Sequence, residues 1–338
     1  MTATDTLRCA VVGAGAWGTA IADRLARNGH AVTLWARETD VVQSINASHE
    51  NARFLAGATL HPALMATDDM AVALRDATLV VYAAPSHVLR PVVQAGASAL
   101  DASAVLAVAT KGIERESLAL MTDVVAQEAP GHSVVAFSGP SFAAEVAAQQ
   151  PTALVAASTS LDAATVLQRA ASAPSFRVYT SDDVIGVELG GALKNVMAVA
   201  TGILEGLGLG FNPRAALITR GLAEMTRLGV ALGAHPETFA GLAGLGDLVL
   251  TCTGSLSRNR AVGVAIGQGT RLDDYLATKE TVAEGVLNAQ SALALAQRVG
   301  IHMPIVEATH RILFDGQSPR EAIAELMVRE LRHERDGR

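Results

Sequence analysis

The sequence predicts an α/β protein in which a mostly parallel sheet is followed by an all-helical part. Short apolar runs alternate with helical patterns over residues 1–181, and this alternation favours parallel strands joined by right-handed crossovers. From about Asp182 the chain changes to long helical patterns rich in Ala, Leu and Gly. The length of 338 residues also fits two domains better than one. We therefore expect one domain over 1–181 and a second over 182–338.

The elements follow from the apolar pattern. The first three are a buried strand over 9–15, a helix over 17–29 that ends at Gly29, and a strand over 31–37. Further apolar runs predict strands over 78–84, 104–110, 133–138, 152–158 and 175–180. Residues 320–338 have the pattern of a helix whose final residues are frayed.

A glycine-rich turn joins the first strand to the first helix. The stretch "GAGAWG" (13–18) matches G-x-G-x-x-G. The motif alone is weak, because ordinary turns also contain glycines, but here it leaves a predicted strand and opens a helix in a βαβ unit. A pyrophosphate can approach such a turn closely and rest on the helix amino terminus. We predict a Rossmann-type dinucleotide site at this turn, with Gly13, Gly15, Ala16 and Gly18.

The end of the second strand bears on the choice of cofactor. NAD sites usually have an acidic residue there that binds the ribose 2′-hydroxyl, but this chain has Arg37 followed by Glu38. An arginine can pair with a 2′-phosphate, which favours NADP(H) over NAD(H). The alternative is that Arg37 only covers the adenine while Glu38 points to solvent.

Composition excludes several classes of protein. Half of the residues are hydrophobic and 17% are charged, so the chain can bury large cores, and a net charge of −7 argues against nonspecific nucleic-acid binding. Cys9 and Cys252 form neither a disulfide framework nor a metal-ligand spacing. The first residues lack a basic leader, and no stretch of about 18 uncharged apolar residues predicts a membrane span. We expect a soluble, cytoplasmic protein without a metal site, whose oligomeric state, a homodimer included, stays open.

Lysine is rare in this chain. Lys and Arg together number 26, yet the only lysines are Lys111, Lys194 and Lys279. A buried lysine can be tuned to give up a proton, whereas arginine stays charged, so we expect these lysines where arginine cannot substitute. Lys194 lies in "ELGGALKNVMAVATGILEGLG" (188–208), which predicts a helix that is apolar on nearly every side. A buried ammonium needs a partner or a chemical role.

Polar residues in apolar surroundings complete the candidate site. Lys111 follows the strand 104–110, at the edge of the sheet where ligands bind in open α/β folds. Gly139 and Ser141 lie in the strand-to-helix turn of "SGPSFAAEV" (138–146), which shows no sign of a serine nucleophile. Asp247 stands between a glycine run and Leu248, and we expect its carboxylate to neutralise a buried lysine.

The stretch "SRNR" (257–260) precedes a helical pattern. Ser257, Arg258 and Asn259 offer hydroxyl, guanidinium and amide donors near a helix amino terminus, which suit a phosphate monoester. The alternative is a solvated loop.

Several of these stretches together resemble one family. "GAGAWGTA", "KGIE", "SGPSFAAEV", "ELGGALKNVMAVATGI", "TRGLAEMTRLG", "TFAGLAGLGDLVLTCTGSLSRNR" and "VAEGV" are similar to the bacterial NAD(P)-dependent glycerol-3-phosphate dehydrogenases. They occur in order from Val11 to about Pro304. The resemblance implies reversible reduction of dihydroxyacetone phosphate to sn-glycerol 3-phosphate for phospholipid synthesis, and a Rossmann domain followed by a helical substrate domain.

The resemblance also implies residue roles. Lys194 resembles the proton donor and acceptor, and the catalytic set is Lys194, Asp247 and Lys111. The substrate contacts it implies are Lys111, Gly139, Ser141, Lys194, Asp247, Ser257, Arg258 and Asn259. Besides the glycine turn, the cofactor contacts it implies are Trp17, Arg37, Lys111, Ala143, Arg258, Val282 and Glu284.

Two other functions remain open from the residues. One is another two-domain hydroxy-acid dehydrogenase, which would need a cationic site for a substrate carboxylate. The other is a non-catalytic sensor that binds NADP(H), which would not need Lys194, Asp247 and a phosphate cluster together.

Overall fold

The computed structural model describes residues 6–278, 283–330 and 333–334. The chain divides into two compact units. Residues up to Lys111 together with Met121–Val184 form the first, called here the sheet unit. Gly112–Leu120 and the chain from Ile185 onward form the second, called the helical unit. Ile113 accordingly belongs to the hydrophobic core of the helical unit, although it lies between two strands of the sheet unit in the sequence.

The described part of the sheet unit contains one sheet of eight strands in the order β3-β2-β1-β4-β5-β6-β7-β8. All neighbouring strands are parallel except β6 and β7. The order reverses at β1, which lies between β2 and β4, and ligands of open α/β sheets bind at such a point. The strands are β1 (Arg8–Val12), β2 (Ala31–Trp35), β3 (Met65–Thr67), β4 (Leu79–Tyr82), β5 (Val105–Val108), β6 (Ser133–Ser138), β7 (Thr152–Ala157) and β8 (Phe176–Ser181).

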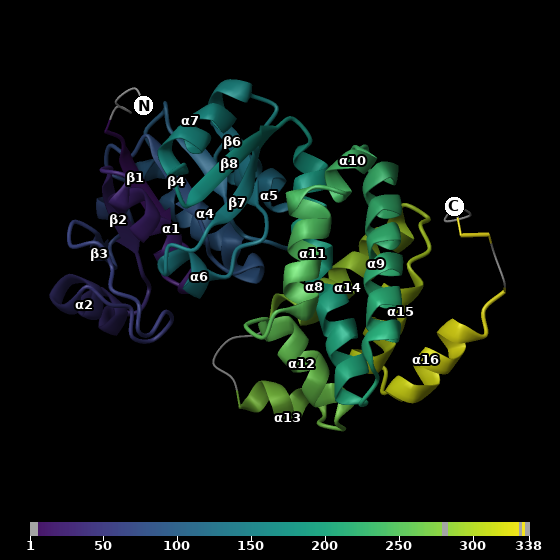
Figure 1. Cartoon of the computed structure of the whole chain (residues 1–338). Helices are drawn as coiled ribbons and strands as arrows, with labels where there is room; N and C mark the ends of the chain where they lie inside the picture. The colour runs from purple at the N-terminus through teal and green to yellow at the C-terminus, as the bar shows by residue number, and fades with distance from the viewer. Residues whose placement is uncertain (1–5, 279–282, 331–332, 335–338) are drawn as a thin grey trace. The chain divides into compact units, whose positions relative to one another are not determined.

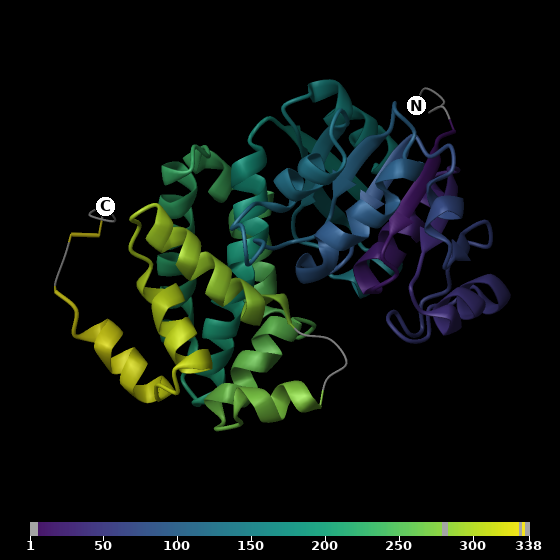
Figure 2. The same ribbon diagram turned by 180° about the vertical axis from the view of Figure 1, so that it is seen from behind.

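Helices cover both faces of this sheet. They are α1 (Ala16–Arg27), α2 (Thr39–Ser48), α3 (Met70–Leu74), α4 (Leu89–Gly96), α5 (Met121–Glu128), α6 (Ala143–Ala147) and α7 (Leu161–Ala171). Helices α1 and α7 contact each other over one face, and α4 and α5 pack together over the other (Figures 1 and 2). Strands buried on both faces explain why the sequence shows continuous apolar runs there.

The predicted α/β fold class is confirmed, and seven of the eight strands overlap the predicted ones. The strand that the sequence did not predict is β3, which has three residues and pairs only with β2 at the sheet edge. A run of three residues is too short for an alternating pattern to stand out.

The helical unit is built around α8 (Val184–Gly206). The other helices are α9 (Phe211–Ala231), α10 (Pro236–Phe239), α11 (Asp247–Thr253), α12 (Arg258–Gly267), α13 (Leu272–Ala277), α14 (Glu284–Arg298), α15 (Pro304–Phe314) and α16 (Pro319–Met327). Figure 1 shows α8 among α9, α11, α12 and α14. Every residue of α8 from Gly186 to Leu204 is buried.

Glycines allow α12 to approach α8 closely. A Cβ on Gly202 would lie 2.1 Å from the Arg260 carbonyl oxygen, and one on Gly263 would lie 2.0 Å from that of Val199. By length and composition α8 could also cross a membrane, but 83% of its apolar window is buried inside the protein, as in a core helix.

The last helix is shorter than predicted. α16 ends at Met327, and Val328 and Arg329 are not helical. The predicted helix over 320–338 was therefore too long, and residues 331–332 and 335–338 lie outside the described part of the chain. Met327 and Val328 are 78% and 82% exposed, so little packing supports a further helical turn.

Candidate active site

The glycine turn of the sheet unit is shaped by close backbone contacts. Gly13 has a φ of 114°, and a Cβ there would lie 2.9 Å from the backbone of Ala83, which follows β4. A Cβ on Gly18 would lie 1.9 Å from the carbonyl oxygen of Gly13, so α1 packs onto the turn only because Gly18 has no side chain. By contrast, nothing lies within 4 Å of a Cβ built on Gly15.

These features fit the pyrophosphate of a dinucleotide. Gly15 is the N-cap of α1 and makes no side-chain cap bond, so the amides that open the helix face the space beside it. Ala16 and Trp17 are the first two residues of α1. The Trp17 indole stacks on Phe137 at 6.4 Å, and its buried Nε1 has no hydrogen-bond partner among the described residues. Ala143 begins α6, which packs beside α1.

Arg37 follows β2 and is engaged by its neighbour. Its Nε and Nη2 donate to Glu38 Oε1 at 3.1 and 2.7 Å, while the Arg37 side chain is 81% exposed. Glu38 is the N-cap residue of α2. Arg37 and Glu38 therefore form an ion pair with each other. The guanidinium is still exposed, so a 2′-phosphate could reach it.

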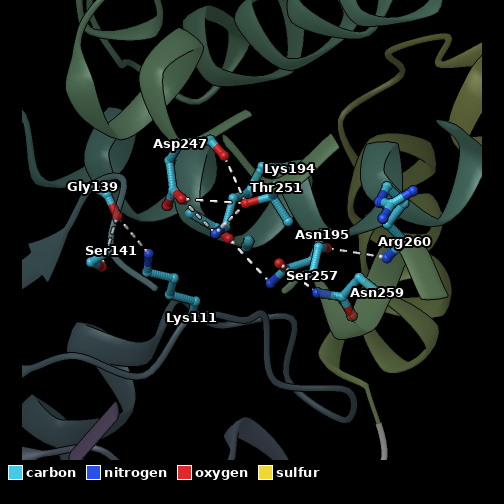
Figure 3. A network of polar contacts seen from close by, with 12 residues as sticks. Lys111, Gly139, Ser141, Lys194, Asn195, Asp247, Thr251, Ser257, Asn259 and Arg260 are labelled. Atoms are coloured by element: carbon cyan, nitrogen blue, oxygen red, sulfur yellow. Dashed lines mark hydrogen bonds and ion pairs between the residues drawn. The ribbon is translucent and has the colours of Figure 1, made fainter. Parts of the chain in front are cut away.

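Lys111 and the turn after β6 meet within the sheet unit. Lys111 Nζ donates to the Gly139 carbonyl oxygen at 3.0 Å, and Ser141 Oγ donates to the same oxygen at 3.1 Å. Gly139 has a φ of 141°, and a Cβ there would lie 3.0 Å from Leu154 Cα in β7. The structure thus brings together the three residues that the sequence predicted here (Figure 3).

Lys194 forms a compact buried cluster in the helical unit. Its Nζ donates to Asp247 Oδ1 at 2.6 Å and to Thr251 Oγ1 at 2.8 Å (Figure 3). Asp247 is fully buried and the Lys194 side chain is 9% exposed. The Thr251 hydroxyl donates to the Asp247 carbonyl oxygen at 2.7 Å, so its lone pairs face the ammonium. Each buried charge therefore has its opposite charge as a direct partner.

A glycine one turn before Lys194 allows this pairing. A Cβ on Gly190 would lie 2.4 Å from the carbonyl oxygen of Ala243. Ala243 lies in a π-helical turn, Leu242–Gly246, that leads directly into α11. The close approach of this turn to α8 places Asp247, the first residue of α11, against the lysine.

The "SRNR" stretch begins α12. Ser257 is its N-cap, and its buried hydroxyl accepts from the Arg260 amide at 3.2 Å. Arg258 is the first residue of the helix and is exposed. Asn259 donates to Asn195 Oδ1 at 2.8 Å and accepts from the Gly285 amide at 2.8 Å, which links α12 to α8 and α14 (Figure 3).

The remaining predicted cofactor contacts lie in different parts of the chain. Glu284 is the first residue of α14, beside Gly285. Val282 lies outside the described residues. The predicted contacts from Gly13 to Ala143 belong to the sheet unit, whereas Arg258 and Glu284 belong to the helical unit.

Comparisons with known proteins decide the family. Two family models match in chain order: NAD-dependent glycerol-3-phosphate dehydrogenase N-terminus over residues 8–164, and its C-terminus over 183–324. The chain belongs to this dehydrogenase family. A curated NAD(P)+ glycerol-3-phosphate dehydrogenase from Geobacter sulfurreducens is 53% identical over 331 residues, covering 97% of this chain and 99% of the relative. The corresponding protein from Nitratidesulfovibrio vulgaris is 49% identical and covers 97% of this chain.

Solved structures of the family have the same fold. A crystal structure of glycerol-3-phosphate dehydrogenase from Coxiella burnetii superposes with a TM-score of 0.92 at 42% identity, over 96% of this chain and 99% of that one. The enzyme from Saccharomyces cerevisiae superposes with a TM-score of 0.82 at 26% identity, over 96% of this chain and all of that one.

Sequence reasoning missed Thr251 of the lysine cluster and Asn195, the neighbour of Lys194. Thr251 lies four residues after Asp247, one helical turn along α11, and this spacing was the available signal. Asn195 follows Lys194 directly, and its amide donates to the Gly191 carbonyl oxygen at 3.3 Å while accepting from Asn259. Neither residue type stands out as catalytic without its partners, so only the fold identifies them.

Cys252, the residue after Thr251, does not have an activated thiol. Burial raises the pKa of the Cys252 thiol to about 12, although Thr201 and Lys194 act in the opposite direction. The thiol is therefore neutral near pH 7 and is a poor nucleophile. Within the described residues, no group of three His, Cys, Asp or Glu side chains is placed to hold a metal ion.

Proposed function

We propose that this protein catalyses the reversible NAD(P)H-dependent reduction of dihydroxyacetone phosphate to sn-glycerol 3-phosphate. Membership of the glycerol-3-phosphate dehydrogenase family supports the reaction. The single observation that carries the mechanism is the buried Lys194, whose Nζ lies 2.6 Å from Asp247 Oδ1 and 2.8 Å from Thr251 Oγ1. We infer that the product supplies glycerophospholipid synthesis.

Reducing the ketone requires a hydride at the carbonyl carbon and a proton at the carbonyl oxygen. The reduced nicotinamide supplies the hydride when it is bound. Lys194 donates the proton as the alkoxide develops and is left as a neutral amine, which then takes a proton from water. Until that transfer its charge stabilises the alkoxide. In the oxidative direction the neutral amine accepts the hydroxyl proton.

Asp247 and Thr251 orient the ammonium for this transfer. Lys194 Nζ has three protons, and two of them are directed to Asp247 Oδ1 and Thr251 Oγ1. Asp247 also compensates the buried charge, so the amine does not need water for that purpose. The two contacts therefore fix the orientation of the ammonium in the helical unit.

Recognition of the phosphate is assigned to the start of α12. Arg258 is exposed at the first position of the helix, where its guanidinium and the helix amides favour an anion. Asn259 already bonds to Asn195 and Gly285, so it holds this helix start against α8 and α14 and keeps Arg258 in place. Remote binding of the phosphate then orients the carbonyl for reaction. Lys111, Gly139, Ser141 and Ser257 complete the proposed substrate contacts.

Binding of the cofactor's pyrophosphate and ribose is assigned to the sheet unit. The open space at Gly15 and the uncapped start of α1 would hold the pyrophosphate. The exposed guanidinium of Arg37 supports NADP(H) as the preferred form. Ala143, Arg258, Val282 and Glu284 remain proposed cofactor contacts. We also propose the functional division at 1–181 and 182–338, a soluble cytoplasmic location and a homodimer.

Initial rates test this function. Purified protein is expected to oxidise NADPH, and NADH less efficiently, when dihydroxyacetone phosphate is added. A substrate panel separates the competing functions: 2-keto acids test for a hydroxy-acid dehydrogenase, and cofactor binding without turnover identifies a sensor. If dihydroxyacetone phosphate gives no turnover with either cofactor while the protein is folded, the proposal is wrong.

A further inference from the structure

The helical unit contains a cavity of about 570 Å³ whose walls include none of the residues assigned to the reaction. Its walls come from α8, α9, α15 and α16, together with Gly300–His302 and residues that follow α16. Figures 1 and 2 show α16 on the outer side of α9 and α15. The volume is in the range of sites that bind small molecules, about 300–1,000 Å³.

We propose that this cavity binds a single-chain anionic amphiphile, meaning an aliphatic chain with a carboxylate or phosphate head group. The proposal rests on how the lining is divided, with aliphatic side chains in one part and guanidinium groups in another. It is independent of the proposed reaction.

The aliphatic part has walls on four helices. Ile203 and Leu204 of α8 are nearly fully buried, and Leu217 of α9, Ile312 of α15 and Ile323 of α16 also line the cavity. These side chains offer no hydrogen-bond partners, so the space suits a hydrocarbon chain better than a polar ligand. A longer hydrocarbon chain should therefore bind more tightly, until the cavity is filled.

The charged part is formed by three arginines. Arg220 and Arg227 lie on the cavity face of α9, and Arg329 follows α16. Burial lowers the pKa of Arg227, and the charges of Arg220 and Arg329 lower it further, while Glu224 acts in the opposite direction. Three guanidinium groups within electrostatic reach of one another favour an anion between them.

Three carboxylates also line the cavity, and the one that is buried, Glu224, is engaged by backbone amides. Glu224 is directed at the start of α15, where it accepts from the Ile305 amide at 2.9 and 3.1 Å. Glu330 and Glu334 lie on exposed chain after α16. His302 Nε2 lies 3.2 Å from Glu307 of α15, and His302 Nδ1 lies 3.3 Å from Arg329 Nη2, so this side chain connects α15 to the chain after α16.

Direct binding measurements by calorimetry on the full chain test the proposal. Decanoate and decyl phosphate, each below its micelle concentration, are expected to bind with one site per chain. Decanol tests the need for the anionic head, and inorganic phosphate tests the need for the chain. If neither amphiphile saturates below about 1 mM, or if decanol or phosphate alone binds as tightly, the proposal is wrong.

Matched variants locate the binding. Ala216→Trp would fill the cavity from an exposed position of α9 and should weaken binding at least about tenfold, whereas Ala215→Trp, exposed on the same helix but outside the cavity, should not. Arg220→Gln should weaken binding about three- to tenfold, against no change for Arg320→Gln, which removes a charge from the exposed start of α16. Basal turnover should be unchanged in all four.

Two further results would overturn the assignment. Equal binding by the Ala216→Trp and Ala215→Trp variants would place the ligand elsewhere. If instead sedimentation showed that Ala216→Trp alone changes the oligomeric state, and no amphiphile bound to the unmodified protein, the cavity would be a contact for a second copy of the chain.

Discussion

The glycine turn of the sheet unit and the lysine cluster of the helical unit are built in opposite ways. Gly13, Gly15 and Gly18 shape the proposed cofactor site through backbone and through space that a side chain would fill. Lys194 and Asp247 act through side chains, and nearly all water is excluded from the pair. The glycine turn depends on residues that have no side chain. The lysine cluster depends on a charge pair that is stable only because the surrounding helices bury it.

This difference determines how each site responds to substitution. In the glycine turn, stability and binding are separable, because Gly18 supports the helix packing while Gly15 borders open space. In the lysine cluster they are coupled, because removing either charge leaves the other buried. One substitution in the glycine turn can therefore change binding without changing stability. In the lysine cluster both charges must be removed before turnover can be lost without a large loss of stability.

The largest effect is expected at Lys194. Lys194→Met should lower kcat by roughly 10²–10⁴-fold, because the general acid is lost, while the affinity for NADPH is kept. It should also destabilise the protein by about 3–5 kcal/mol, because Asp247 stays buried without its partner. Adding Asp247→Asn removes the second charge and should recover much of the stability but none of the turnover. Rates and thermal unfolding of both variants provide the measurement.

Lys194→Arg sharpens this test. It keeps the positive charge but does not readily release a proton, and a planar guanidinium needs space beside Asp247 and Thr251 that the close packing at Gly190 does not offer. We expect kcat to be severely reduced. A folded Lys194→Arg protein with near-normal kcat would mean that charge alone suffices and that the proton comes from another source.

The two regions also differ in how far the sequence predicted them. The glycine turn was predictable because its motif, strand and helix are adjacent in the sequence. The burial of Lys194 was predictable from the apolar residues around it. The Lys194–Asp247 contact spans 53 residues and depends on the close approach at Gly190, so the sequence suggested the partner without showing the geometry. Only its spacing from Asp247 pointed to Thr251, and nothing pointed to the Asn195–Asn259 bond, because threonine and asparagine at these positions suit many helices. The assignment of 112–120 to the helical unit likewise follows from packing of Ile113 that no local pattern reveals.

A second buried carboxylate makes the helical unit sensitive to pH. Burial raises the pKa of Glu224 to about 7, against the lowering effect of its bonds to Ile305 and Val306. Because the folded-state value lies above the unfolded one, the stabilisation is complete below about pH 4.5 and is lost as the pH rises through 7. The loss amounts to about 3 kcal/mol.

Glu224→Gln tests this dependence. The variant keeps an acceptor for the α15 amides but cannot ionise, so its melting temperature should exceed that of the unmodified protein at pH 8 by several degrees and match it near pH 4.5. Glu237→Gln, at an exposed position in α10, serves as the control. A constant difference between Glu224→Gln and the unmodified protein across this range would contradict the expectation.

The glycine turn offers the matching test in the sheet unit. Gly15 has a φ of −63°, which alanine adopts easily, and its Cβ would meet no atom within 4 Å. Gly15→Ala should therefore melt like the unmodified protein without cofactor but bind NADPH about ten- to a hundredfold more weakly, through overpacking against the pyrophosphate. Gly18→Ala should instead destabilise the protein before any cofactor is added, because its Cβ would lie 1.9 Å from the Gly13 oxygen. If both variants had the same unfolding and binding behaviour, the separation of stability from binding would be wrong.

The smallest effect is expected at Arg37, where a side chain modifies the backbone-built site. Arg37→Asp replaces attraction for a 2′-phosphate with repulsion, and each term is worth up to about 1 kcal/mol at a side chain that is 81% exposed. The ratio of kcat/KM for NADPH to that for NADH should fall about ten- to thirtyfold, mainly through KM for NADPH. Arg37→Gln should give about half of this change in free energy, since it removes the attraction and adds no repulsion.

Both effects should shrink at high salt, because exposed charges are screened. If the ratio is unchanged in Arg37→Asp, then Arg37 does not contact the 2′-phosphate, and its ion pair with Glu38 Oε1 at 2.7 Å is its only role at this edge of the sheet.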